Sequence, residues 1–171
     1  DLSGWDVSNV TSMNQIFNNA ISFNGDISTW DVSSAENMGW MFESTPFNHD
    51  ISSWDVTSAL QMAAMFMNAT NFNSDISSWD MTSVTTIAIM FNGAESFNQP
   101  IGLWNVTNII DMNNTFGGAI SFNQDLSDWD VSNLENIDSV IDQLLKINKS
   151  EIINQSKKIY DLKILQKFNH S

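Results

Sequence analysis

The stretch Ile27-Ser28-Thr29-Trp30-Asp31-Val32-Ser33 decides the fold, because the chain contains six close variants of it. Their tryptophans are Trp5, Trp30, Trp54, Trp79, Trp104 and Trp129, separated by 25, 24, 25, 25 and 25 residues. A fixed period of this length is typical of solenoids, in which each repeat forms one coil that stacks on the next. The sequence therefore predicts about six stacked coils rather than a domain with one central core.

Apolar and polar residues alternate at each tryptophan, as in Trp5-Asp6-Val7-Ser8. Alternation with a period of two indicates a short strand, with Trp5 and Val7 pointing into the coil and Asp6 and Ser8 pointing out. The Ser or Thr that follows in each repeat lies where the N-cap of a helix is expected. These residues are Ser8, Ser33, Thr57, Thr82, Thr107 and Ser132.

The residues that follow have helical spacing. After Val10, apolar residues follow at the third, sixth and seventh positions, which are Met13, Ile16 and Phe17. This spacing places all four on one apolar face of a helix. The later repeats keep this pattern, and each of the first five ends in a Phe-Asn pair such as Phe72-Asn73. We expect the asparagines to form a structural ladder that satisfies backbone groups at a bend. The predicted fold is a right-handed, leucine-rich-repeat-like α/β solenoid with short parallel strands on one face and short helices on the other.

Two regions are expected from the repeat and the charge. Residues 1–141 form the solenoid, with a truncated first repeat, and residues 142–171 leave the period and are predicted to be a Lys-rich helical cap or tail. The chain opens at Asp1 in the middle of a repeat, so we expect it to be part of a longer protein.

Composition excludes several classes of function. The formal net charge is −14, and the eighteen Asp and Glu residues before Lys146 are accompanied by no Lys or Arg. A segment with this much negative charge repels nucleic acid and anionic membrane surfaces. There is no Cys for disulfides or a Cys-based zinc site, and no apolar run long enough to insert into a membrane.

The repeat W-D-V-S-x-Φ-x-x-M-x-x-M-F-x-x-A-x-x-F-N-x-D-I-S resembles that of BspA-like leucine-rich-repeat surface proteins, over about residues 1–141. The resemblance implies an extended solenoid displayed outside the cell or at the cell surface and used in adhesion or recognition. It implies no catalytic residues and no cofactor, and it does not extend to the Lys-rich end.

An outward row of carboxylates is the first candidate binding site. Its members are Asp6, Asp31, Asp55, Asp80 and Asp130, interrupted by Asn105, and a second row consists of Asp26, Asp50, Asp75 and Asp125. Backbone N–H groups that offset the charge are the structural interpretation. Ca²⁺ held between coils is the functional one, although the sequence contains neither an EF-hand loop nor a glycine-rich calcium nonapeptide, and we expect no other metal.

Positions that break the repeat are the second candidate. Leu103 occupies an outward column held elsewhere by Gly, Thr, Ser or Asp, and Trp40 replaces Gln, Ala, Ile or Asn. Exposed aromatic side chains are favoured anchors at interfaces, but Trp40 could equally pack over the shortened second repeat.

The prediction from sequence is thus a recognition or adhesion module, not an enzyme, that binds a protein or glycan with a cationic surface. Near-identical repeats do not build one differentiated catalytic pair, and His49 and His170 lie too far apart in the array for a triad. The alternative is a structural protein that stacks head to tail into filaments or a surface layer.

Overall fold

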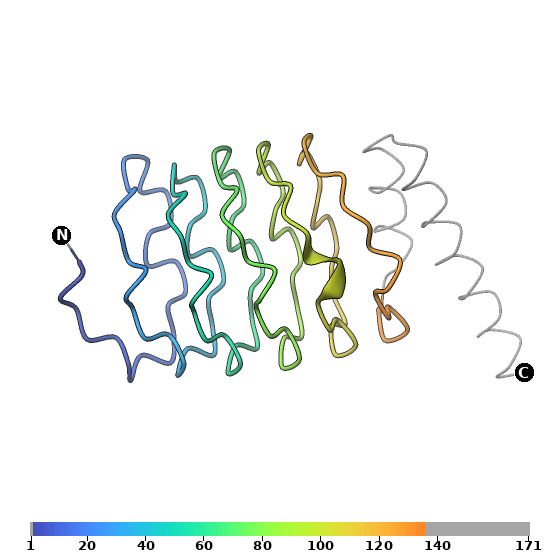
Figure 1. Ribbon diagram of the computed structural model, residues 1–171, viewed down its shortest axis with the longest axis horizontal. Coiled ribbons are helices and arrows are strands. Elements are labelled where there is room, and N and C mark those ends of the chain that lie inside the picture. Colours follow the sequence, from blue (N-terminus) through green and yellow to red (C-terminus); the bar gives the residue numbers. More distant parts are fainter. Residues whose placement is uncertain (1, 136–171) are drawn as a thin grey trace, which may run out of the picture.

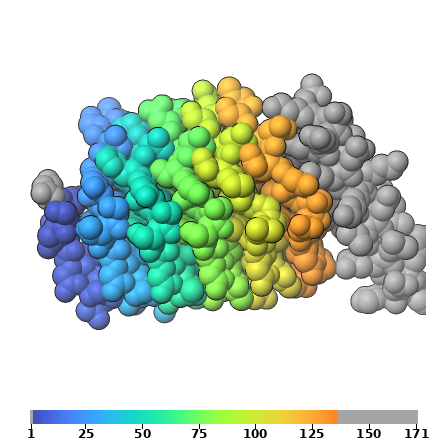
Figure 2. Space-filling model, in the orientation of Figure 1, coloured from blue at the N-terminus to red at the C-terminus, as the bar shows by residue number. Residues whose placement is uncertain are grey.

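The computed structural model describes residues 2–135, and in them the chain winds into coils that stack in sequence order (Figure 1). The space-filling view shows the coils as adjacent bands, each packed against the next (Figure 2). The predicted cap at residues 142–171, together with the end of the repeat region at 136–141, lies outside the described residues.

Regular secondary structure is nearly absent from this part of the chain. Its one helix is η1, a 3₁₀ helix at Ile101–Leu103. Isolated parallel bridges join Ser12, Asn37, Gln61, Thr86 and Asp111 in succession, and they belong to no strand. No helix between residues 2 and 135 is long and apolar enough to cross a membrane. The prediction of an α/β solenoid with strands on one face and helices on the other was therefore wrong.

Turns replace the predicted helices. In the described part of the chain, each segment that follows one of the first five repeat tryptophans contains residues with positive φ, which an α-helix excludes. They fall in two columns: Gln15, Trp40, Ala64, Ile89 and Asn114 in the first, and Asn19, Ser44, Asn68, Gly93 and Gly118 in the second. Successive turns return a side chain to the interior every three or four residues, as a helix does. The apolar spacing could not distinguish the two structures.

The backbone of these turns bonds to the next coil rather than to itself. Alternate N–H groups of the first coil, at Met13, Gln15, Phe17 and Asn19, donate to carbonyl oxygens of the second, and the same four bonds join every later pair up to the fifth coil at 2.7–3.2 Å. Each bonded peptide unit points its C=O toward the preceding coil and its N–H toward the following one. Four hydrogen-bond chains therefore run along the stack with their peptide dipoles aligned.

The predicted strands are also absent, because the coils do not pair along the tryptophan face. Within residues 2–135 no backbone–backbone bond joins neighbouring coils at the Trp-Asp-Val segments. Side chains make the link instead. The indole N–H of Trp54 donates to the carbonyl oxygen of Ile27 at 3.3 Å, and the indoles of later coils repeat the contact.

The core consists of the predicted columns. Trp, Val, Met and Phe side chains of the inner coils are buried, and the aromatic rings stack from coil to coil. Phe66 lies 3.7 Å from Phe72 of its own coil and 5.8 Å from Phe91 of the next, measured between ring centroids. Continuous stacking of apolar rings supplies the cohesion that a central core gives other domains.

The predicted asparagine ladder is confirmed. The side-chain oxygen of Asn48 accepts the backbone N–H of Asn73 at 2.8 Å, and that of Asn73 accepts the N–H of Asn98 at 2.9 Å. Asn24 and Asn98 act in the same way. These amides satisfy backbone donors at the bend, so the Asn column is structural.

Candidate functional site

The first carboxylate column is exposed, and one local contact fixes each of its members. Asp31 accepts the backbone N–H of Ser33 at 3.1 Å and its hydroxyl at 2.6 Å. Asp6, Asp55, Asp80 and Asp130 accept the backbone N–H two residues on in the same way. The Ser and Thr residues are therefore hydrogen-bond partners of these carboxylates. The prediction that they are helix N-caps was wrong.

The interruption at Asn105 preserves this geometry. Its side-chain oxygen accepts the N–H of Thr107 at 3.2 Å, as a carboxylate would. The turn thus requires a side-chain acceptor but not its charge. The fold therefore does not require a negative charge at the five Asp positions of this column.

A second column of carboxylates runs beside the tryptophans. Asp26, Asp50, Asp75 and Asp125 each accept the backbone N–H of the serine two residues on, at 2.8–3.0 Å. Pro100 replaces the acid in the fifth coil.

The hydrogen bonds of the first carboxylate column lower the pKa values of its members. The hydroxyl of the Ser or Thr two residues on, and then its backbone N–H, hold the pKa of Asp6, Asp31, Asp55, Asp80 and Asp130 below its ordinary value of 3.8. Repulsion from Asp31 and Asp80 acts in the opposite direction on the pKa of Asp55, but it is a smaller effect. The column is fully charged at neutral pH.

Neither column forms a compact metal cage in the described part of the chain, where no group of three His, Asp or Glu side chains is placed to hold an ion. Ca²⁺ bound between two coils therefore stays a prediction.

Trp40 lies in the first positive-φ column, on the turns, with its side chain half-buried and a φ of 53°. Ala64 follows it in the column and is fully buried, and half-buried Ile89 comes next. Trp40 is therefore on the turns, whereas the carboxylate columns and Leu103 are at the tryptophan segments.

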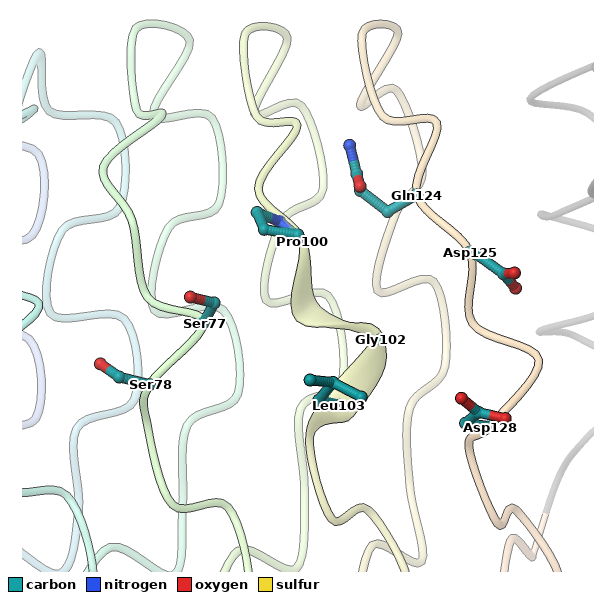
Figure 3. A pocket seen from close by; sticks show the side chains of 8 residues that line it. All are labelled: Ser77, Ser78, Pro100, Gly102, Leu103, Gln124, Asp125 and Asp128. Carbon is teal, nitrogen blue, oxygen red and sulfur yellow. The ribbon is translucent and has the colours of Figure 1, made fainter.

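Leu103 is 88% exposed, at the end of η1. In the same column Ser53 and Ser78 donate their hydroxyls to carbonyl oxygens of the preceding coil at 3.4 and 3.0 Å. Leucine cannot make this bond, so its side chain projects into a groove whose walls come from three successive coils (Figure 3).

Sequence reasoning singled out the altered fifth repeat but missed the neighbours that complete the groove. Ser77 and Ser78 come from the fourth coil, and Gln124, Asp125 and Asp128 from the sixth. Apart from Asp128, an acid in a column where the first four coils have Gly, Thr or Ser, these residues match the same columns of other coils, so only the stacking shows that they surround Leu103.

A family model described as "Mycoplasma protein of unknown function, DUF285" matches residues 1–88 and again residues 74–169. Two consecutive matches agree with a repeat protein and are compatible with a place at a cell surface, although they do not confirm the BspA-like resemblance. No curated protein and no solved structure matches the chain. Because the two matched segments together span nearly the whole sequence, the chain belongs to the family described as Mycoplasma protein of unknown function, DUF285.

Proposed function

We propose that the chain is a non-catalytic recognition module that binds a partner with a cationic surface across its two carboxylate columns. The supporting observation is that exposed carboxylates recur coil after coil in fixed orientations, while the sequence contains no Lys or Arg before Lys146. Aligned charges of one sign create a negative stripe, which speeds encounter with a basic surface and weakens as salt rises.

The partner is a protein or a glycan with positive charge, met outside the cell or at its surface. This location follows from the resemblance to BspA-like repeats, which is itself part of the proposal. Protease treatment of intact producing cells tests it, since a surface-displayed chain is digested while cytosolic proteins are spared.

A non-catalytic role follows from the uniformity of the columns. Acid–base catalysis by two carboxylates needs different environments that separate their pKa values. Here Asp31, Asp55 and Asp80 each accept hydrogen bonds from the Ser or Thr two residues on, and the pKa of each is lowered.

Calorimetry with polylysine, and separately with Ca²⁺, tests the binding surface. The variant is Asp31→Asn/Asp55→Asn/Asp80→Asn, which keeps the turns because Asn105 already supports the same geometry. We expect polylysine to bind the wild type and to bind the triple variant more weakly, with a smaller salt dependence.

The matched control is Glu36→Gln/Glu95→Gln/Glu135→Gln, which removes the same charge from exposed residues outside both columns. Equal affinity of both triple variants for polylysine would mean that net charge alone matters and that the column is structural. Heat released by Ca²⁺ only when the column is intact would support the calcium interpretation.

One observation favours the structural alternative of head-to-tail stacking. Trp5 is 57% exposed, whereas Trp54 in an inner coil is 4% exposed. A second copy of the chain stacked against the first coil would cover the ring of Trp5. Light scattering across a concentration series separates the two functions, because a particle mass that grows with concentration supports stacking and a constant monomer mass contradicts it.

A further inference from the structure

The fifth coil departs from its neighbours where they carry the second carboxylate column. Asp75 and Asp125 accept the N–H of Ser77 and Ser127, which fixes a turn before each tryptophan. Pro100 has no side-chain acceptor to offer the residue two positions on, Gly102, and in this turn the N–H of Ile101 donates to the carbonyl oxygen of Gln99 at 2.9 Å. The backbone then tightens into η1.

Gly102 lets η1 approach the sixth coil. A Cβ atom added at this residue would collide with the backbone carbonyl oxygen of Asp125. The other coils have serine in this column, at Ser28, Ser52, Ser77 and Ser127. The close approach is therefore specific to the fifth coil and depends on the absence of a side chain.

The result is the coil-five groove, an open hollow of about 420 Å³ lined by Ser77, Ser78, Pro100, Gly102, Leu103, Gln124, Asp125 and Asp128. Figure 3 shows Leu103 between the serines of the fourth coil and the acids of the sixth. Leu103 is the most exposed large apolar side chain of the described residues.

The chemistry of the groove is apolar at Leu103 and negative on the side of the sixth coil. Asp128 contributes the carboxylate, since Figure 3 shows the side chain of Asp125 pointing away from Leu103, and no basic side chain lines the groove. The complementary occupant presents an apolar side chain to Leu103 and an adjacent cation to Asp128. A segment with Lys or Arg next to a large aliphatic residue meets both requirements, and the alkyl stems of Lys and Arg also cover apolar surface.

We propose that the coil-five groove anchors a basic segment of a partner protein in which an aliphatic residue neighbours Lys or Arg. The inference rests on the proposed function and adds to it. The carboxylate columns attract any basic surface, whereas the coil-five groove sets the register of the partner through Leu103. Specificity of this kind comes from a local apolar contact within a wider electrostatic field.

Fluorescence anisotropy of the full chain with two labelled short peptides tests the proposal. One peptide alternates Lys and Leu and the other alternates Lys and Ser, so their charges are equal. We expect the Lys–Leu peptide to bind the wild type about tenfold more tightly, the size of effect that burial of one leucine supports.

The variants are Leu103→Ser, which introduces the residue that other coils carry in this column, and Asp128→Ser, which does the same for the acid. Leu103→Ser should abolish the preference for the Lys–Leu peptide, and Asp128→Ser should weaken binding of both. Ile120→Thr is the control, because it removes a 71% exposed aliphatic side chain outside the groove and Thr70 already occupies its column. It should bind as the wild type does.

A preference for the Lys–Leu peptide that survives Leu103→Ser, or that is lost equally in Ile120→Thr, would overturn the inference. Equal binding of both peptides to the wild type would also overturn it while leaving the proposed function intact. Absence of binding by either peptide would refute both. A chitosan oligosaccharide that binds more tightly than the Lys–Leu peptide, with affinity that depends on Leu103, would replace the protein segment by a cationic glycan.

Discussion

The indole N–H of Trp79 donates to the backbone carbonyl oxygen of Ile51 at 3.1 Å, across the boundary between two coils. Both residues are buried. The repeated tryptophan thus has two roles, since its ring fills the core and its one polar atom adds a hydrogen bond between coils. The same carbonyl oxygen of Ile51 also accepts the backbone N–H of Trp54 at 3.2 Å. This relationship recurs at every pair of coils from Trp30 to Trp129.

Trp79→Phe should lower the free energy of unfolding by about 1 kcal/mol or more, because it removes one of the two hydrogen bonds to the carbonyl oxygen of Ile51 and shrinks a buried ring. Urea denaturation followed by circular dichroism measures the change. Trp5→Phe is the control, since Trp5 is largely exposed and should lose much less. Equal losses in the two variants would contradict a stabilising role for the buried indole and its hydrogen bond.

Phe72→Ala should destabilise the stack by about 3–5 kcal/mol through the cavity left between coils. The ring of Phe72 is fully buried and stacks on Phe66 at 3.7 Å and on Phe97 at 5.9 Å. Phe23→Ala in the first coil provides the comparison, because that ring is only half-buried and should cost less. A loss at Phe72 no greater than at Phe23 would contradict a core that runs continuously through the stack.

Acidification should destabilise the chain as the first carboxylate column becomes protonated. The folded pKa values of Asp31, Asp55 and Asp80 are lowered, so their contribution is present above the unfolded value of 3.8 and is lost as the pH falls through the folded pKa. Urea denaturation at pH 7 and at pH 3 should show a lower unfolding free energy at the acidic pH.

The triple variant Asp31→Asn/Asp55→Asn/Asp80→Asn should show a weaker dependence on pH, because its amides do not titrate and still accept the turn N–H groups. An unchanged pH profile would mean that the loss of stability at low pH comes from other carboxylates.

Gln15→Gly distinguishes the observed turns from the helix that the apolar spacing had indicated. Gln15 is exposed and has a φ of 62°, a conformation that costs an L-residue about 1–2 kcal/mol and glycine almost nothing. We expect a small gain in stability, measured by thermal unfolding. In a helix the same change would cost about 1 kcal/mol.

Thr11→Gly is the matched control, because Thr11 is exposed in the same coil and lacks a positive φ. It should lose stability. A loss at Gln15 equal to that at Thr11 would contradict the left-handed conformation of the turn.

Some features of the candidate site could be predicted from the sequence of the repeats, and others depend on how the coils stack. The outward position of Asp31 and the exposure of Leu103 follow from their columns, and both could be predicted from one repeat compared with the others. The hydroxyl contact that orients Asp31 was misassigned as a helix cap, because a serine two residues after an acid fits both structures. The coil-five groove needed residues about 25 positions apart, such as Ser78, Leu103 and Asp128, to be brought together.

The sequence by itself determined the period of the coils, the Trp, Val, Met and Phe columns of the core, the asparagine ladder and the sign of the surface charge. Each of these depends on the identity of a residue at a fixed place in the repeat. Only the tertiary structure decided the backbone conformation. The N–H of Met38 bonds to the oxygen of Gln61 in the next coil and not to an oxygen of its own segment. Such a bond exists only once the coils are stacked in register, so local spacing could not distinguish these turns from a helix.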